Sequence, residues 1–279
     1  MSRLLLVAVA LVGIALPAKA DRAAPVANPV ERALRVPVVV VGKVTAIEKD
    51  AVEAELYPGA EKKVAHKIAV VKVETDLTGA GGATHLKIGF VTVAAGLRRG
   101  PDNPELKEGQ EWLFFLVKHH AGEFYSIPYM TPPLDAKAAN AKAQIEEVKK
   151  ALALVADPAK ALKAEKAEDR FAAAVTIIYK LRTAPEASFK GVEPVALTAD
   201  ESRPLLKALA EGAWKVDPGE RSVNPYRSFV LLGLTEADGW KPPVAEAGKD
   251  FVELTRTAYI KWLDGAGKDY RIKKLIPKK

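Results

Sequence analysis

The chain has 279 residues, 49% of them hydrophobic, and a formal net charge of +7, a globular composition long enough for one large domain or two ordinary ones. The absence of cysteine excludes disulfides, thiolate metal sites, cysteine nucleophiles and attachment of a lipid to a cysteine. The excess of basic residues is small for a nucleic-acid-binding protein, so no nucleic acid is expected as a partner.

The first part of the chain, residues 1–20, has the pattern of a secretory signal peptide. Arg3 gives a positive start, residues 4–16 are an apolar run, and Ala18-Lys19-Ala20 has the small-x-small form that signal peptidase recognises. The run of about thirteen residues is shorter than the roughly twenty that cross a bilayer, and no later segment reaches that length either. We therefore expect cleavage after Ala20, a periplasmic or secreted mature chain, and no transmembrane segment in it.

Strand-forming sequence fills the first half of the mature chain. Residues 21–29 are predicted to be a spacer rich in Ala and Pro, and residues 30–36 one or two helical turns. Runs of β-branched residues, separated by short turns without helices, predict a small closed or nearly closed antiparallel barrel over residues 30–133. Its five strands are expected at residues 38–47, 68–75, 86–93, 112–117 and 124–127.

Helical spacing of Ala, Leu, Glu and Lys predicts five helices over residues 135–267. Asp135 is expected to cap the first, Asp157-Pro158 to restart the chain as a cap and a first-turn proline, and Gly265 to end the last. The predicted fold class is therefore α+β, with a small five-stranded antiparallel OB-like β-barrel followed by an irregular α-helical domain.

One helix start has two interpretations. Thr198 and Glu201 have the spacing of a capping box, but that start would put Pro204 inside the helix at a cost of about 3 kcal/mol. Asp200 or Ser202 is therefore preferred as the N-cap, because either leaves Pro204 in the first turn.

The end of the chain, residues 268–279, is predicted to be a basic tail with six basic residues and one acid. Ile272, Leu275 and Ile276 interrupt the charges. A solvated tail anchored by these apolar residues is favoured over contact of the basic side chains with anionic lipid, lipopolysaccharide or wall polymer.

Two predicted strands, residues 38–44 and 112–117, are apolar on both faces. A barrel interior accepts only one face, so the other needs a cover. The helical half has a surplus of large apolar side chains, and these are expected to bury a large interface with the barrel: Phe171, Ile178, Leu209, Trp214, Phe251 and Trp262.

Three stretches carry a resemblance to a known family. Val38–Val44 is a valine strand ending in Gly-x-Val, Ile68–Gly79 closes on Leu-x-Gly, and Leu106–Leu116 contains x-Gly-x-x-aromatic. Over residues 30–130 the chain resembles the netrin-like, or tissue-inhibitor-of-metalloproteinases-like, OB-fold barrel of bacterial exported proteins. The animal inhibitors chelate the zinc of a protease through an N-terminal cysteine. Here the mature start would be Asp21, so neither that mechanism nor any functional residue is carried over.

A second resemblance lies in the helical half. Residues 231–243, with the sequence LLGLTEADGWKPP, are similar to C-terminal regions of exported proteins of unknown function in planctomycete-type bacteria. This resemblance implies a source and brings no activity with it.

The four histidines are His66, His85, His119 and His120. His66 and His85 begin successive strands and could approach across a ladder, whereas His119 and His120 are adjacent in a strand and should point to opposite faces. A zinc site needs three or four converging ligands, and no HExxH or HxH motif is present. Surface histidines are therefore the preferred interpretation, and no metal or cofactor is predicted.

No catalytic residue is assigned from the sequence. No serine lies in a Gly-x-Ser-x-Gly or Ser-x-x-Lys motif, and residues 265–268 and 79–82 lack the rest of a phosphate loop or a dinucleotide site. The pairs Glu146-Glu147 and Asp200-Glu201 are expected on exposed helix positions, which does not support an acid–base pair. Core filling is preferred to a ligand platform for the strand aromatics, namely Trp112, Phe114, Phe115, Phe124 and Tyr125.

These observations favour an exported, non-enzymatic binding or scaffolding protein, a monomer whose partner is an unknown protein or an anionic envelope component. Barrel rim loops are the expected contact, from Tyr57 to His66 and from Leu97 to Glu108. The alternative is a periplasmic hydrolase with a site assembled from dispersed residues. A cleft with converging histidines and carboxylates would favour the hydrolase, and an exposed apolar rim would favour the binding protein.

Overall fold

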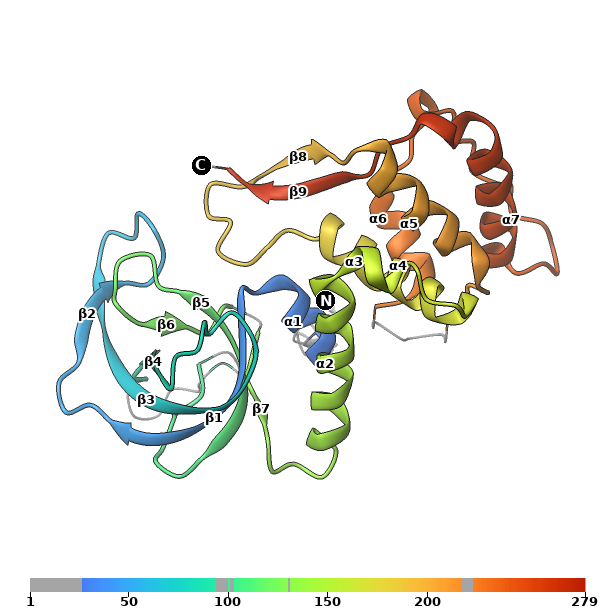
Figure 1. Ribbon diagram of the computed structural model, residues 1–279. Coiled ribbons are helices and arrows are strands. Elements are labelled where there is room, and N and C mark those ends of the chain that lie inside the picture. Colours follow the sequence, from blue (N-terminus) through green and yellow to red (C-terminus); the bar gives the residue numbers. More distant parts are fainter. Residues whose placement is uncertain (1–26, 94–99, 101–102, 130, 217–222, 279) are drawn as a thin grey trace, which may run out of the picture.

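The computed structural model describes residues 27–93, 100, 103–129, 131–216 and 223–278. It shows an α+β protein, with a seven-stranded sheet in the first half of the chain and most of the helices in the second (Figure 1). The expected signal peptide and most of the expected spacer lie outside the described residues. Of the helices in the described part, none is long and apolar enough to cross a membrane.

The sheet contains the five expected strands and two short ones that were not expected. The expected strands are β1 (Val38–Ile47), β3 (Lys63–Thr78), β4 (His85–Val91), β5 (Glu111–Lys118) and β6 (Tyr125–Ser126), and the additional ones are β2 (Val52–Glu55) and β7 (Leu134–Asp135).

β1 lies inside the sheet, where it pairs antiparallel with β3 on one side and β5 on the other. β3 also pairs antiparallel with β4, and β5 with β6. β2 and β7 pair antiparallel with β3 and β5, respectively. One pairing is parallel and joins β4 to β6 through Ile88–Tyr125 and Gly89–Ser126. The prediction of a five-stranded antiparallel barrel is thus confirmed only in part, because the structure has a seven-stranded sheet with one parallel pairing.

The two apolar faces of β1 and β5 pack into two different cores. Val40, Val44 and Phe114 lie in a core on one face of the sheet. Val39 and Phe115 lie on the other face, which is covered by two helices near the middle of the molecule in Figure 1, α1 (Pro29–Arg35) and α2 (Ala141–Ala156). The expected need for a cover is confirmed.

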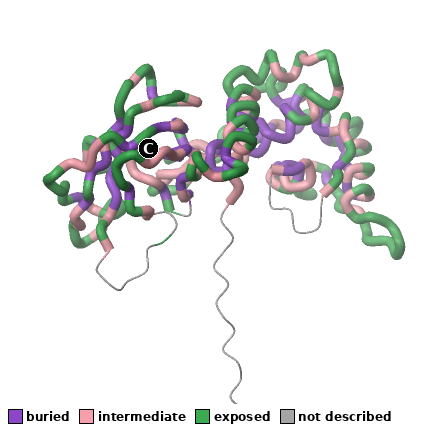
Figure 2. Tube along the Cα trace, turned by 90° about the horizontal axis from the view of Figure 1, so that it is seen from below, coloured by how far each residue is buried: buried purple, intermediate pink, exposed green. Residues whose placement is uncertain are grey.

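The side chains expected to provide this cover pack elsewhere. Ile178, Leu209, Trp214 and Trp262 belong to a separate helical core, with Phe171 packed against it, and Phe251 is exposed. The prediction was wrong for these side chains because residues of α1 and α2, with Leu134 and Ala187, pack on the apolar outer face instead. Figure 2 shows the result as buried residues in both parts of the molecule.

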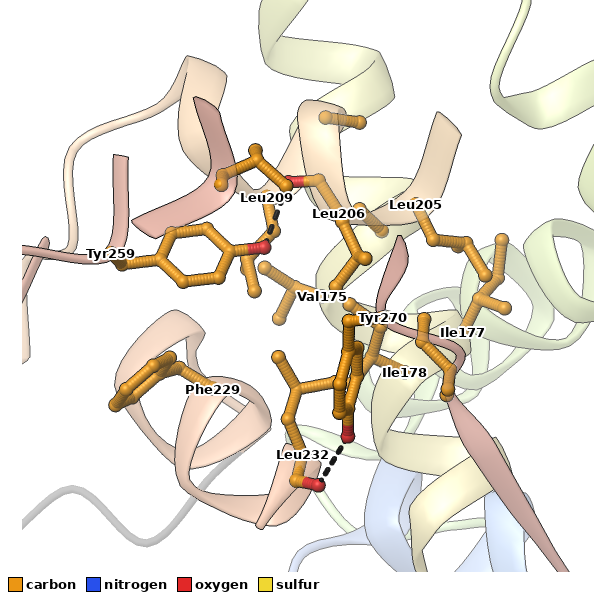
Figure 3. Close-up of a cluster of buried hydrophobic side chains, with 14 of the residues drawn as sticks. Val175, Ile177, Ile178, Leu205, Leu206, Leu209, Phe229, Leu232, Tyr259 and Tyr270 are labelled. Atoms are coloured by element: carbon orange, nitrogen blue, oxygen red, sulfur yellow. Dashed lines mark hydrogen bonds between the residues drawn. The ribbon is translucent and has the colours of Figure 1, made fainter. Parts of the chain in front are cut away.

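The helical core is formed by the remaining helices, closed by hydrogen bonds from buried tyrosines (Figure 3). The Tyr259 hydroxyl donates to the Leu206 carbonyl at 2.9 Å, and the Tyr270 hydroxyl donates to the Leu232 carbonyl at 2.8 Å. These bonds satisfy hydroxyls that would otherwise be costly to bury. The helices are α3 (Pro158–Ala161), α4 (Ala167–Arg182), α5 (Ala199–Glu211), α6 (Pro225–Leu232) and α7 (Phe251–Asp264), with short 3-10 turns at Glu236–Asp238 and Ala266–Asp269.

Several helix ends match the sequence prediction and two do not. Asp157 caps α3, and Gly265 follows the end of α7, as expected. Asn140, rather than Asp135, is the N-cap residue of α2. Asp135 belongs to β7 instead, where it pairs with Trp112 of β5.

The start of α5 was predicted at the wrong residue. Thr198 and Glu201 form the complete capping box, and Pro204 lies inside the helix. In the box, the backbone N–H groups of Thr198 and Glu201 each donate to the side chain of the other residue. A helix that began later would lose these two hydrogen bonds. Ser202, one of the two caps preferred from the sequence, is fully buried inside the helix, and its hydroxyl accepts a hydrogen bond from the Ile272 N–H at 3.1 Å.

The prediction of a solvated basic tail is also wrong. Lys273–Pro277 form β9, which pairs antiparallel with β8 (Val192–Ala196). Ile272 is completely buried just before this strand. The tail is therefore part of a two-stranded sheet that extends from the helical part in Figure 1.

Candidate functional site

A cavity of about 540 Å³ opens beside the sheet, within the usual size range of small-ligand sites. Segments far apart in the chain line it: the start of β3, the ends of β4 and β5, β6, and the segment that follows α4. Both halves of the chain therefore build the cavity. Its walls include Val64, His66, Phe90, Val91, Asn103, Val117, Ser126, Ile127, Pro128, Glu186 and Ala187.

Large apolar side chains stand exposed around this cavity. Leu56, Tyr57 and Phe189 are 57%, 56% and 56% exposed, and Tyr129 is 79% exposed. We call these four residues the apolar mouth. Exposed apolar groups gathered beside an open cavity are typical of interaction sites.

Three of the four histidines come together at the cavity. β5 ends at Lys118, so His119 and His120 lie in the following turn and not in a strand. Their ring centroids are 4.4 Å apart, and the ring of His66 lies 5.4 Å from that of His119. The prediction that His119 and His120 point apart is therefore wrong, because the strand alternation on which it rests has already ended.

Two of these histidines are not surface residues. His66 is 4% exposed and His119 is 7% exposed, which corrects the preferred sequence interpretation. His66 and His85 do not meet, since the register pairs His66 with Val91 and His85 with Lys72 at the opposite end of the ladder. Within the described residues, no group of three or more His, Asp or Glu side chains could hold a metal ion.

Hydrogen bonds to the backbone set the protonation of the two buried rings. His119 Nδ1 accepts from the Ala121 N–H at 3.1 Å, and His119 Nε2 lies 3.1 Å from the Glu55 carbonyl oxygen. His66 Nδ1 lies 2.9 Å from the Val64 carbonyl oxygen. Because a carbonyl only accepts, the proton is on Nε2 of His119 and on Nδ1 of His66. Neutral His119 thus has both nitrogens engaged, whereas neutral His66 keeps Nε2 as an acceptor.

The Phe124 ring packs against two of the histidines. Its ring stacks on His119 with a centroid distance of 4.4 Å and lies 5.3 Å from the ring of His66. Two glycines make room for it, because a Cβ built on Gly89 or on Gly122 would come within 2.3 Å of the Phe124 ring. Glycine inside a strand is typical of such close approach.

Most other polar side chains at the cavity are already paired. The Asn103 amide group both accepts from the Val91 N–H and donates to the Val91 carbonyl, at 3.0 and 2.9 Å. Glu186 pairs with Arg35 at 2.6 Å, and burial raises the pKa of the Glu186 carboxyl. His120 Nε2 lies 3.7 Å from a Glu55 carboxylate oxygen.

Among the described residues that line the cavity, no hydroxyl is hydrogen-bonded to a histidine. The Thr84 hydroxyl and Nδ1 of His85 are hydrogen-bonded at 3.1 Å, but neither residue lines the cavity. Ser126 lines the cavity, but no hydrogen bond joins it to any of the three rings. The arrangement therefore lacks the nucleophile–base contact of covalent catalysis, and its polar groups mainly hold the walls in place.

The expected rim loops are partly at the cavity. Tyr57, Val64 and His66 of the first loop line it, as does Asn103 of the second, while residues 97–99 and 101–102 of the second loop lie outside the described part. Core filling is confirmed for three of the five strand aromatics, since Phe114, Phe115 and Phe124 are buried in three different cores. Trp112 and Tyr125 are only partly buried and pack against the core that contains Phe114.

We expect the protein to lose stability as the pH falls from about 7 to about 5. Burial, and then the neighbouring His120 and His66, lower the pKa of His119. Between this lowered value and the ordinary value of about 6.5, the unfolded chain binds the proton and the folded chain does not. The stability that depends on neutral His119 is therefore present above this window and is lost as the pH falls through it.

Urea unfolding at a series of pH values checks this expectation. His119→Gln should lose part of the pH dependence between 7 and 5, and His85→Gln should keep all of it, because His85 is exposed and lies away from the cavity. An identical pH dependence in His119→Gln and the unmodified protein would contradict the prediction.

Comparison of the chain with protein-family models, with curated proteins and with solved structures found no match.

Proposed function

We propose that this chain is an exported, non-enzymatic binding or scaffolding protein that holds a protein or an envelope polymer at its apolar mouth. The observation that carries the proposal is the exposure of Leu56, Tyr57, Tyr129 and Phe189 around a cavity of about 540 Å³. Covering such side chains stabilises a complex by about 25 cal/mol for each Å² of apolar surface removed from water.

A periplasmic hydrolase is the second candidate, because His66, His119 and His120 meet near Glu55. Three features make it the weaker one. Both nitrogens of His119 are bonded to the backbone, Glu186 is paired with Arg35, and no described hydroxyl that lines the cavity is hydrogen-bonded to a histidine. Of the two buried histidines, only His66 keeps a nitrogen that could act as a general base, and no hydroxyl nucleophile of the described residues is bonded to it.

We propose that the sheet is an OB-like barrel of the netrin-like kind, built by β1, β3, β4, β6 and β5. Support comes from the pairing of each of these strands with the next and of β5 with β1. Export, with cleavage after Ala20, is part of the same proposal and rests on the signal-peptide pattern of residues 1–20. The protein is proposed to act as a monomer.

Changes at the apolar mouth test the binding function. Full-length mature protein carrying Tyr129→Ser and Phe189→Ser is expected to retain at least tenfold less partner than the unmodified protein, since aromatic anchors at an interface commonly contribute 2 kcal/mol or more. Retention of partner from an envelope fraction on the immobilised protein is the measurement.

Val244→Ser is the matched control, because Val244 is 82% exposed but lies in the helical part, away from the cavity. It should retain the same partner as the unmodified protein. If the doubly substituted protein retained that partner equally well, the apolar mouth would not be the binding surface.

A further inference from the structure

We infer that the cavity takes the side chain of a tyrosine or a tryptophan from a partner protein, whose O–H or N–H donates a hydrogen bond to Nε2 of His66. This inference rests on the proposed binding function and names the chemistry of the group that enters the cavity.

The first step is an acceptor at the cavity. His66 is 4% exposed and lines the cavity, and its Nδ1 proton is directed to the Val64 carbonyl. Its Nε2 has no hydrogen-bond partner among the described residues, and it is not one of the buried side-chain atoms that lack a partner. Solvent therefore reaches this atom. A ligand that displaces this solvent loses affinity unless it donates a hydrogen bond to Nε2 itself.

The second step is the character of the walls. Val64, Phe90, Val117, Ile127 and Pro128 make the lining around His66 mainly apolar. Exposed aromatic rings, those of Tyr57, Tyr129 and Phe189, stand at the entrance. An aromatic ring of the partner can pack edge-to-face or offset against such rings. The cavity therefore offers apolar contact to a ring and, at Nε2 of His66, an acceptor to its polar end.

The third step is the reason to expect a protein side chain in the cavity and not a sugar. A sugar ring brings several hydroxyl groups, and each of them needs a partner when buried. The polar groups of the walls are largely occupied, since Asn103 is bonded to Val91, Glu186 to Arg35, and His119 to the backbone. The Ser126 hydroxyl is the main other polar group of the walls. Tyrosine and tryptophan each carry one donor on a large apolar body, which suits Nε2 of His66 better than the several hydroxyls of a sugar do.

Pairs of small probes that differ only in the donor test this inference on the full mature chain. p-Cresol carries the phenol of tyrosine, and 4-methylanisole is the same ring with the O–H methylated. Likewise, 3-methylindole has the N–H of tryptophan, and 1,3-dimethylindole lacks it. At pH 8 we expect the donor member of each pair to bind about two- to tenfold more tightly, as one neutral hydrogen bond allows. NMR titration gives both affinities and shows whether the His66 ring signals shift.

The ratio within a pair is the informative quantity. His66→Leu should bring the ratio to one, whereas His85→Leu, which changes an exposed histidine away from the cavity, should leave it unchanged. A purely structural role of His66 would weaken both members of a pair alike. The ratio in the unmodified protein remains decisive even if His66→Leu folds poorly.

The remaining outcomes overturn the inference in distinguishable ways. Equal binding of both members at the cavity would refute the hydrogen bond to His66 and leave the binding function standing. Binding of N-acetylglucosamine at the cavity without binding of p-cresol or 3-methylindole would show a glycan site instead. Binding of none of these probes at millimolar concentration, together with unchanged partner retention by the mouth variant, would overturn both proposals.

Discussion

Phe124→Ala is expected to lower the free energy of unfolding by about 3–5 kcal/mol, the usual cost of removing a buried aromatic ring. Phe124 is 2% exposed, belongs to a small core with Ala54 and Ile68, and contacts the rings of His66 and His119. The closely placed Gly89 and Gly122 carry no side chains that could move into the empty space. The cavity left by the ring should therefore collapse only in part.

Chemical denaturation measures this loss, and Phe189→Ala is the control. Phe189 lines the same cavity but is 56% exposed, so its removal should change the free energy of unfolding by no more than about 0.5 kcal/mol. The NMR signals of His66 and His119 should shift in Phe124→Ala because their ring contacts are lost. Equal stability of the two variants would mean that Phe124 does not support the histidines.

The sequence predicted the long strands and the two-residue β6, and it missed the other short strands. The bounds of β1 agree fully, because ten consecutive strand-forming residues leave little freedom. β2 and β7 have four and two residues, too few for a periodic pattern. β8 and β9 were missed because each gains a partner only when distant parts of the chain meet, and neither shows an alternation of buried and exposed residues.

The candidate site depended on details that periodicity does not resolve. His119 joins the histidine group only because β5 ends one residue before it, and helix and strand ends are the least certain part of any sequence-based assignment. Phe189 reaches the cavity from the helical half, a placement decided by tertiary packing. One signal was present in the sequence: Gly89 lies inside a predicted strand, where glycine indicates that a bulky group approaches closely.

Arg227→Ala is expected to lower the free energy of unfolding by about 2–3 kcal/mol, between the costs of breaking an exposed and a buried ion pair. Arg227, in α6, pairs with the buried carboxylate of Glu31, in α1, and the side chain of Arg227 is 41% exposed. α1 also lies against the sheet. A second contact ties it to the helical part, because Lys180 of α4 donates a hydrogen bond to the carbonyl of Leu34 in α1. The pair therefore helps to hold the sheet and the helical core together.

The pH dependence of the stability of Arg227→Ala shows whether the loss comes from the Glu31 carboxylate, left buried without its partner, or only from lost packing. Burial raises the pKa of Glu31, and Arg227 opposes the rise, so the pKa should climb further in Arg227→Ala. A carboxyl group whose pKa is higher in the folded state stabilises that state at low pH, and this stability is lost as the pH rises through the folded value. The destabilisation should therefore be larger at pH 7.5 than at pH 5.

A second substitution completes the test. Adding Glu31→Gln to Arg227→Ala removes the buried charge that has lost its partner, so the double variant should recover part of the lost stability at pH 7.5 and lose the additional pH dependence.

The same denaturation curves bear on how the two halves unfold. Because the pair joins α1 to α6, a single unfolding transition in all variants would agree with halves that melt together. If Arg227→Ala were equally destabilised at both pH values, and Glu31→Gln gave no recovery, packing of the long Arg227 side chain would account for the loss and the carboxylate would not.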